Sequence, residues 1–565
     1  MSRLMRLLTE LPTILRTLQR IKPMQAIAQI RHTLFGLGAP TRLEVQAPTQ
    51  TIHSGATDFL PPPAHVRASS SDSIELLGTA FELGDQPDWD TPVHGPLFAY
   101  HLHQQEYLRN PAFSPQARAN RMLDWVDRHP EGVGWDPHPI SLRLLCWGKM
   151  LMTPGSLELA TDERNSLLAS MADQAETLSR GLEIRLQGNH LLSNLLAVVW
   201  AGILLEGSIS AGWRDRGSML IDEIERQIHP DGGHEERSPM YHSLLLENLL
   251  DLLNVCRVAP ARAPTGLVDT LEAAASRMVG ALLSWTHPDG DIALFADSAF
   301  DIAARPDALI GYATRLGVGA LNEPPRAPGS ILLSQSGYVR LEAEEVLLIA
   351  SIAGPAPPHQ PGHAHCDALA FELSLAGHRF ITDTGLFEYR PGERRDRART
   401  TAAHSTMQID GQEQSEIWAA HRVGGRPVVE LVGWDGESQA EATCRGWSLR
   451  QTTHRRTYRV AARGVTIIDE IEGPCRYARL CLPVDPAWRI ELDAASFRAN
   501  AARAADGSTT SLDAPRIELE LSNEFAWHVE RGPYFPSFGR EIERDLLVGE
   551  ATGPRRATLR INLCD

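Results

Sequence analysis

The sequence predicts a multidomain protein of the α+β class, helical in its first half and an antiparallel β-sandwich in its second. A chain of 565 residues is too long for one ordinary hydrophobic core. From about Pro96 to Leu321 the apolar residues recur at the three- and four-residue spacing of amphipathic helices. After Ser330 the spacing becomes alternating, in short runs that end at Gly, Asp or Pro. This change of period indicates two architectures joined in one chain.

The helical half consists of successive amphipathic stretches. Three of them are ISLRLLCWGKMLM, HLLSNLLAVVWAGILL and SLLLENLLDLLNV, and Gly or Pro residues punctuate the chain between them. Short connections between amphipathic helices are typical of an array of helical hairpins. We therefore expect a helical domain over residues 85–325, with a boundary in the Pro-rich segment NEPPRAPGS at 322–330.

The second half contains many short alternating runs, including VLLIASIAG, ALAFELSLAG, RPVVELVGW and ATLRINL. Strands in that number, without helices between them, predict an antiparallel β-sandwich over residues 331–565. Ahead of the helical domain, residues 46–84 are rich in Pro, Ser, Thr and Ala, and we expect an extended linker there.

Residues 1–45 form a separate basic segment that we expect to be an amphipathic helix. The first 36 residues carry six basic side chains against the single acid Glu10, with leucines at helical spacing. The segment lacks a continuous apolar core and a small-residue cleavage site, so it does not resemble a secretory signal. Such a helix could contact a membrane surface or pack against the rest of the protein, and we favour packing.

The overall composition narrows the possible partners and locations. The formal net charge of −17 argues against nucleic-acid binding, which needs a basic surface. A polyanionic substrate would need a locally positive cleft in this acidic protein. The longest apolar stretch, residues 195–205, is too short to span a bilayer. We expect a cytoplasmic or membrane-peripheral protein, with a periplasmic location left open.

A first polar motif opens an apolar helix at QGNHLLSN, residues 187–194. Gly188 breaks the preceding helix, Asn189 stands at the N-cap position and His190 opens the next helix. Free N–H groups and the helix dipole favour an anion at such a place, and a sugar carboxylate would suit it. An ordinary helix cap explains the same residues.

A second polar motif is DGGHEERSPMYH, residues 231–242. Ser238 followed by Pro239 is a strong helix start, which places Tyr241 and His242 in the first turn of the next helix. The same preference for an anion applies at this helix end. The alternative is that Tyr241 and His242 only cover the end of the helix.

The densest group of metal-binding residue types lies in PGHAHCDALAFELSLAGHRFITDTG. It holds His363, His365, Asp367 and Asp383, and His404 follows in TTAAHST. If the strand formed by the following leucines extends backward, the first three of these residues share one face. Histidines and an aspartate so placed could hold a zinc ion with one open position. A hydrogen-bonded cluster without metal is the alternative.

Together and in this order, the motifs resemble those of the heparinase II/III-like polysaccharide lyases, which include alginate and heparan lyases. The resemblance begins at GPLFAYHLHQQEYL and continues through GWDPHPISLRLLCW, LQGNHLLSN, DGGHEERSPMYH, GHAHCDALAFEL, DTGLFEY and RTTAAHST. It covers most of the chain from about residue 85. It implies an incomplete (α/α) toroid joined to an antiparallel β-sandwich, with the active site between them.

The resemblance also implies roles in a β-elimination that cleaves uronate-containing glycans. Removing the C5 proton builds charge on the uronate carboxylate, which amide and imidazole donors stabilise, while an acid protonates the departing oxygen. Tyrosine can act as the base only if a cationic neighbour lowers its pKa of about 10. The resemblance implies that Asn189, with His190, neutralises the uronate carboxylate, that Tyr241 is the catalytic acid or both acid and base, and that His363 is a base. It implies a structural zinc ion held by His365, Asp383 and His404. Arg237 and His242 are weaker candidates for substrate contact.

Two other functions remain open from the sequence. A non-catalytic glycan-binding or assembly protein of exopolysaccharide machinery could keep the fold and the metal site. A glycoside hydrolase would use two carboxylates, for which Asp231, Glu235 and Glu236 are the candidates. The basic segment and the lack of a recognisable signal favour action on a polymer that the cell itself makes, an inference from analogy.

Overall fold

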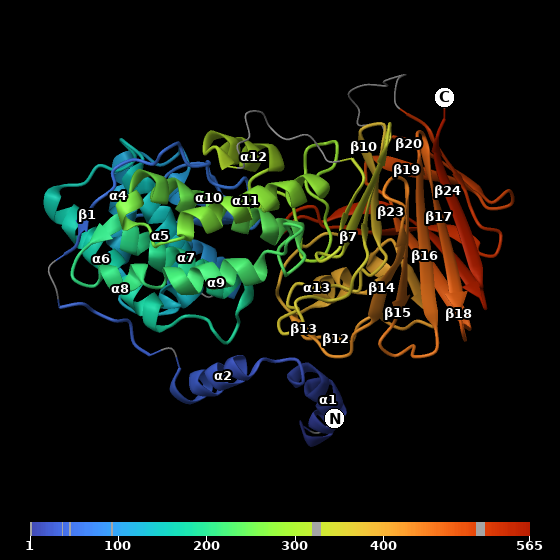
Figure 1. Cartoon of the computed structure of the whole chain (residues 1–565), viewed down its shortest axis with the longest axis horizontal. Coiled ribbons are helices and arrows are strands. Elements are labelled where there is room, and N and C mark those ends of the chain that lie inside the picture. Colours follow the sequence, from blue (N-terminus) through green and yellow to red (C-terminus); the bar gives the residue numbers. More distant parts are fainter. Residues whose placement is uncertain are drawn as a thin grey trace.

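The computed structural model describes residues 3–36, 38–44, 47–91, 94–318, 329–503 and 515–564. A helical region and a region of antiparallel sheets lie side by side, in the predicted order (Figure 1). The predicted domain boundary at 322–330 falls largely outside the described residues. Within the described residues, no helix is long and apolar enough to cross a membrane.

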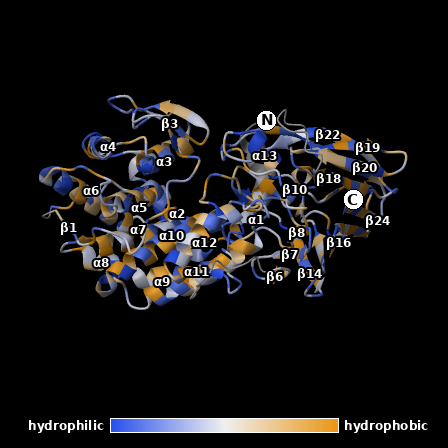
Figure 2. Ribbon diagram, turned by 90° about the horizontal axis from the view of Figure 1, so that it is seen from above, coloured by the Kyte–Doolittle hydropathy of each residue, from blue (hydrophilic) through white to orange (hydrophobic). Residues whose placement is uncertain are grey.

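The helical region is built around α7 (Gly188–Leu204), which packs against helices on several sides. Residues 195–205, which run from the middle of this helix to the residue after its end, are fully buried, as the apolar sequence predicts. The surrounding helices carry both hydrophobic and hydrophilic residues, as α9 shows in Figure 2, because each has one buried face. They are α3 (Pro96–Gln104), α4 (Pro115–Arg128), α5 (Pro137–Met152), α6 (Thr161–Arg180), α8 (Ser210–Arg214), α9 (Gly217–Gln227), α10 (Pro239–Val258), α11 (Leu267–Ser284) and α12 (Pro306–Arg315).

The second region contains three large antiparallel sheets whose apolar side chains meet in one core. Leu348, Leu480 and Ile467, one from each sheet, are members of that core. The five-stranded sheet has the order β10 (His378–Ile381), β9 (Phe371–Leu375), β8 (Val346–Ser351), β7 (Tyr338–Ala343) and β6 (Ile331–Leu333). The four-stranded sheet has the order β11 (Met407–Ile409), β18 (Tyr477–Pro483), β23 (Ile542–Thr552) and β22 (Ala526–Tyr534).

The eight-stranded sheet is the largest of the three. Its order is β14 (Val428–Trp434), β15 (Gln439–Arg445), β16 (Thr453–Ala461), β17 (Gly464–Glu472), β24 (Arg556–Leu563), β21 (Ile517–Glu520), β20 (Arg498–Arg503) and β19 (Trp488–Asp493). A short helix, α13 (Glu393–Ala398), and the β12–β13 pair (Ile417–Trp418 and Arg422–Val423) lie in the loops that face the helical region.

The prediction of an extended linker over residues 46–84 was wrong for much of its length. Within it, β2 (Arg67–Ala68), β3 (Ser73–Leu76) and β4 (Thr79–Glu82) form a three-stranded sheet. Leu77 and Gly78 both have positive φ, at 53° and 73°, as the two-residue turn of a hairpin requires. Apolar side chains of this segment are buried in the helical core, which is why the chain is ordered there: Ile52, Leu60, Val66, Ile74, Leu76 and Leu83.

Two N-terminal helices, α1 (Arg3–Leu18) and α2 (Pro23–Phe35), lie along one side of the molecule and bridge its two regions (Figure 1). Arg16 of α1 donates to Glu416 of the sheet region at 2.7 Å. Lys22, just before α2, donates to Gln187 of the helical region at 3.0 Å. The predicted packing of this segment on the protein is therefore seen, and polar side chains make the contact.

Candidate active site

A cavity of about 180 Å³ lies where three parts of the chain meet. The helical region contributes Asn189 and Tyr241, the 46–84 segment contributes His65, and the sheet region contributes Tyr389 and Phe538. Typical small-molecule pockets measure about 300–1,000 Å³, so this cavity accommodates only a short part of a glycan chain. The resemblance implied an active site between the two domains, and the cavity lies at that junction.

Asn189 is held by the backbone geometry at the start of α7. The helix begins at Gly188 with Gln187 at the N-cap position, so the prediction of Asn189 as N-cap was displaced by two residues. The Asn189 N–H donates to the Glu236 carboxylate at 2.8 Å. Gly188 has φ 54°, and a Cβ at this position would lie 2.1 Å from the same carboxylate oxygen. Glycine is therefore required for Glu236 to reach the helix end.

Tyr241 lies in the first turn of α10, and this prediction is confirmed. Ser238 caps the helix by accepting the Tyr241 N–H at 3.2 Å. The Tyr241 ring stacks on His363 with centroids 3.9 Å apart, and its hydroxyl hydrogen-bonds to that of Tyr389 at 2.8 Å. Burial raises the pKa of Tyr241 well above its ordinary value, although the bond to Tyr389 opposes the shift. The phenol therefore keeps its proton at neutral pH and suits an acid.

His363 is oriented by Asp297, a buried residue in the loop after α11. The His363 Nδ1–H donates to one Asp297 oxygen at 2.9 Å, and Arg395 donates to the same oxygen at 2.9 Å. Burial would raise the pKa of Asp297, but the charge of Arg395 and the bonds from His363 and His365 hold it well below its ordinary value. Because Nδ1 carries the proton, Nε2 of His363 is the basic nitrogen, and it lies 3.6 Å from Glu236.

His365, Asp383 and His404 come together in a fully buried cluster. Their potential ligand atoms all lie within 4.8 Å of one another. His365 donates its Nε2–H to Asp297 at 2.8 Å, which leaves Nδ1 unprotonated. That Nδ1 and the Nε2 of His404 are buried without a hydrogen-bond partner in the described part of the chain. Two such nitrogens beside a carboxylate match the donor set that zinc prefers, so the residues fit a structural zinc ion.

The shared orientation of His363 and His365 has a different origin from the one predicted. Strand β9 begins only at Phe371, because Leu369 has φ 62° and interrupts the extended backbone. His363 and His365 therefore lie in a loop and point the same way because both bind Asp297.

Arg237 and His242, predicted as weaker substrate contacts, lie elsewhere. Arg237 donates to the carbonyl of Gly354 at 2.9 Å and joins the two regions. His242 is fully buried, with Nε2 bonded to the Met278 carbonyl at 2.9 Å and its ring against Trp285. Neither side chain lines the cavity, so their geometry is structural.

The cavity is not lined by free positive charge, contrary to the expectation for a polyanion site. Lys149 is the one Lys or Arg among its described lining residues. The Lys149 ammonium lies 2.7 Å from Asp251 and 3.2 Å from Glu247, which neutralise it. The neutral polar side chains that could bind a ligand in the cavity include Asn189, two tyrosines and three histidines. These are Tyr241, Tyr389, His65, His101 and His138.

Sequence reasoning missed several residues of the site. Asp297 and Arg395 carry no motif signal, because their partners lie far away in the chain. Tyr389 lies in the quoted segment DTGLFEY, but its role appears only through its contact with Tyr241. His190 hydrogen-bonds to Glu183 at 3.1 Å. Glu183 lies seven residues earlier in a loop, and no regular helix or strand spacing predicts that contact.

Comparison with known proteins gives the class that this fold and site define. The model described as "Heparinase II/III N-terminus" matches residues 115–308, and "Heparinase II/III-like, C-terminal" matches residues 325–561. The chain therefore belongs to the heparinase II/III-like family. The crystal structure named Heparinase III superposes with a TM-score of 0.65 at 15% identity, over 97% of this chain and 93% of that one. This likeness supports the fold alone.

Two curated relatives differ in how much of their length they share. The heparin-sulfate lyase of Pedobacter heparinus is 26% identical over 59% of this chain, which spans only 55% of that protein. The FtsZ-localized protein C of Caulobacter vibrioides is also 26% identical, over 87% of this chain and 86% of its own. The relative with the longer match, the FtsZ-localized protein C, is not named as a lyase.

Proposed function

We propose that this protein is a polysaccharide lyase that cleaves uronate-containing glycans by β-elimination and leaves an unsaturated uronate end. The observation that carries the proposal is the Tyr241–His363 pair: Tyr241 lines the cavity together with Asn189, and His363 stacks on the Tyr241 ring. Tyr241 is a protonated phenol and His363 is an imidazole oriented by Asp297, so an acid and a base lie 3.9 Å apart, ring to ring. A glycan-binding protein needs no such pair.

The proposed mechanism gives each side chain one step. The Asn189 amide, with His190 beside it, binds the uronate carboxylate and stabilises the charge that develops there. Nε2 of His363 takes the C5 proton, since its other nitrogen donates to Asp297. Tyr241 gives its proton to the departing glycosidic oxygen, and its bond to Tyr389 holds the hydroxyl in place. A C–O bond breaks and a C4–C5 double bond forms, without added water.

The carboxylates proposed for hydrolysis have other partners. Asp231 accepts from Ser336 and from the backbone N–H groups of Gln335 and Gly233. Glu235 pairs with both of its oxygens to Arg226 at 2.9 Å. Glu236, the third candidate, accepts the Asn189 N–H at 2.8 Å and lies 3.6 Å from Nε2 of His363. The pairing of Asp231 and Glu235 outside the cavity weakens the hydrolase alternative, which needs two carboxylates.

The test is the ultraviolet absorbance of an unsaturated uronate, measured on a panel of alginate, heparan, chondroitin and host exopolysaccharide. We expect wild type to generate the absorbance, and Tyr241→Phe to lower the rate by about 10²–10⁴-fold, the usual worth of a general acid. Tyr107→Phe is the matched control, because Tyr107 is a buried tyrosine of the helical region outside the cavity. New reducing ends without absorbance would overturn the lyase proposal.

We also propose that His365, Asp383 and His404 hold a structural zinc ion, and that the helical pairs form an incomplete toroid. The buried, unpartnered nitrogens of the two histidines support the metal. When bound, the ion would tie the loop before β9 to the segment after β10, because its ligands come from both. The packing of α7 on α5, α6, α9 and α10 is consistent with the toroid.

A second proposed function is attachment to an anionic membrane surface through α1 and α2, and it is favoured by an exposed apolar face. Gln25, a polar residue of α2, is buried against the protein, whereas the apolar side chains point outward. Residues 11–36 contain four basic residues and no acidic one. Apolar and basic side chains together suit an anionic lipid surface. The outward side chains are Leu11, Leu15, Leu18, Met24, Ile27, Ile30, Leu34 and Phe35.

Sedimentation with anionic and neutral vesicles tests the attachment. We expect wild type to bind anionic vesicles and Ile27→Glu/Leu34→Glu to lose most binding. Val432→Glu is the control, since Val432 is 51% exposed on β14 and Ile27 is 66% exposed. Equal binding of all three proteins would contradict the proposal. Because a long-matching relative is named for FtsZ, adding FtsZ to the assay asks whether an assembly role accompanies the attachment.

A further inference from the structure

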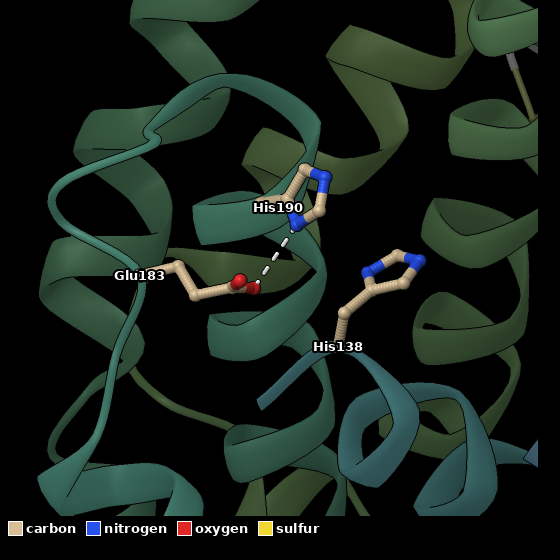
Figure 3. Close-up of side chains that lie close together, drawn as sticks. All are labelled: His138, Glu183 and His190. Carbon is tan, nitrogen blue, oxygen red and sulfur yellow. Dashed lines mark hydrogen bonds and ion pairs between the residues drawn. The ribbon is translucent and has the colours of Figure 1, made fainter. Parts of the chain in front are cut away.

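A second group of potential metal ligands lies in the helical region, apart from the buried cluster. It consists of His138 in the first turn of α5, Glu183 in the loop before α7, and His190 in the first turn of α7 (Figure 3). One ligand atom from each lies within 4.8 Å of the other two. Three separate positions in the chain, 138, 183 and 190, thus converge on one point.

One nitrogen in this group lacks the partner that its surroundings require. Nδ1 of His138 is buried and has no hydrogen-bond partner among the residues that the structure describes. Figure 3 shows this edge of the ring turned toward Glu183 and His190. Nδ1 of His190 lies 3.1 Å from the Glu183 carboxylate, and the two imidazole rings are 4.6 Å apart. A buried polar atom normally has a partner, so an absent one calls for an explanation.

A divalent cation accounts for both the convergence and the unpartnered nitrogen. Two imidazoles and one carboxylate form a donor set that binds zinc and leaves one position open. Asn194 donates to Glu183 at 3.2 Å, which orients the carboxylate as outer partners of metal ligands do. The His190 side chain is 31% exposed, so the group is accessible to an ion from solution.

The position of the group gives the ion a role. His138 and Asn189 line the candidate cavity, and Asn189 precedes His190 in the chain. Among the described residues that line the cavity, Lys149 is the one lysine or arginine, and Glu247 and Asp251 neutralise its charge. A cation at this edge would supply the positive charge that a carboxylate-bearing or sulfated sugar needs.

We propose that His138, Glu183 and His190 form a divalent-cation site of the zinc class, with its open position toward an anionic oxygen of the glycan. Binding of the ion is independent of the proposed lyase activity, whereas the contact with the glycan rests on it. The ion is therefore measured without substrate, so a failed activity assay and a failed metal assay are separate results.

The test is equilibrium dialysis of the chelator-treated full-length protein against zinc, followed by metal analysis. We expect His138→Ala and the isosteric Glu183→Gln each to bind one zinc fewer per chain than wild type. His404→Ala removes a ligand of the buried cluster, so it reports any loss there separately. His101→Ala is the matched control, because His101 lines the same cavity and is no member of the group.

Cobalt(II) and crystallography give readouts that do not depend on stoichiometry. Visible absorption bands of bound cobalt should weaken in Glu183→Gln and persist in His101→Ala. An anomalous peak at the zinc edge between the three side chains would establish the site directly. Unchanged zinc content in Glu183→Gln together with no such peak would overturn the proposal. The group would then be a His190–Glu183 hydrogen bond with His138 beside it.

Discussion

At the scale of single residues, Asp297 connects the proposed base to the proposed zinc cluster. It accepts from His363 and His365, and it is the carboxylate partner of Arg395. Arg395 and Asp297 are both fully buried. Arg395 in turn lies over the ring of Tyr389, 5.2 Å from its centroid. A single buried ion pair thus positions the proposed base, His363, and supports Tyr389, which hydrogen-bonds to the proposed acid, Tyr241.

Replacing Asp297 should therefore cost stability as well as activity. In Asp297→Asn the Arg395 charge remains buried without its counterion, which costs about 3–5 kcal/mol in known cases. We expect urea unfolding to show that loss, and the double variant Asp297→Asn/Arg395→Met to be less destabilised than the sum of the single changes. Additive losses would show that the two residues do not act as a pair.

Gly188 gives a sharper test of the cavity geometry. In Gly188→Ala the new Cβ would lie 2.1 Å from Glu236 at a φ of 54°, so the start of α7 must shift and carry Asn189 with it. Gly155→Ala is the control, with a φ of 73° and open space around the new Cβ. We expect Gly188→Ala to lose activity on any uronate polymer cleaved by wild type, while Gly155→Ala shows only strain of about 1–3 kcal/mol. Equal activity of the two would contradict the role of Glu236.

At the scale of elements, local signals predicted the helices and strands that start and end with strong punctuation. Ser238–Pro239 correctly predicted the start of α10, and alternation correctly predicted antiparallel strands. The 46–84 segment was mistaken for a linker because its composition is loop-like. The alternating run SIELLGTAFEL inside it forms a hairpin, and tertiary burial rather than composition orders it.

The candidate site was predictable where one motif carried several residues. Tyr241 and His363 come from such motifs, and the structure places them in contact. Arg237 and His242 belong to the same motif as Tyr241, yet helix periodicity turns His242 into the core. Asp297 was not predictable, because its role depends on contacts across more than sixty residues that no local pattern encodes.

The element pair β16–β17 carries a pH-dependent part of the stability. Burial would raise the pKa of Asp469 on β17, but Arg456 and His454 on β16 lower it to about 2. A carboxyl group with an ordinary pKa of about 3.9 then stabilises the fold above that pH and loses the contribution as pH falls toward 2. The contribution at neutral pH is about 2–3 kcal/mol.

We therefore expect the stability gap between wild type and Asp469→Asn to narrow on acidification. Urea unfolding at about pH 6, 4 and 3 measures it, since these values bracket the ordinary carboxyl pKa. Glu430→Gln is a suitable control on the same sheet, because Glu430 is exposed on β14. A gap that stays constant with pH would contradict the assigned ion pair.

At the scale of the whole molecule, the site exists only where the two regions meet. Asn189 and Tyr241 come from helices, His363 and Tyr389 from loops of the sheet region, and Asp297 joins the two sets. The N-terminal helices also bridge both regions while they expose an apolar face. The proposed elimination and the proposed membrane attachment therefore belong to different parts of the same chain, the first to the junction and the second to α1 and α2.

The central claim is that the cavity cleaves by elimination, and the origin of the oxygen in the product tests it most directly. Digestion of a responsive uronate polymer in heavy-oxygen water, followed by mass spectrometry, separates elimination from hydrolysis. We predict products that lack the heavy isotope at the cleaved bond and carry one water fewer than hydrolytic products. Products that gain one heavy oxygen per cleavage would contradict the account and assign the site to a hydrolase.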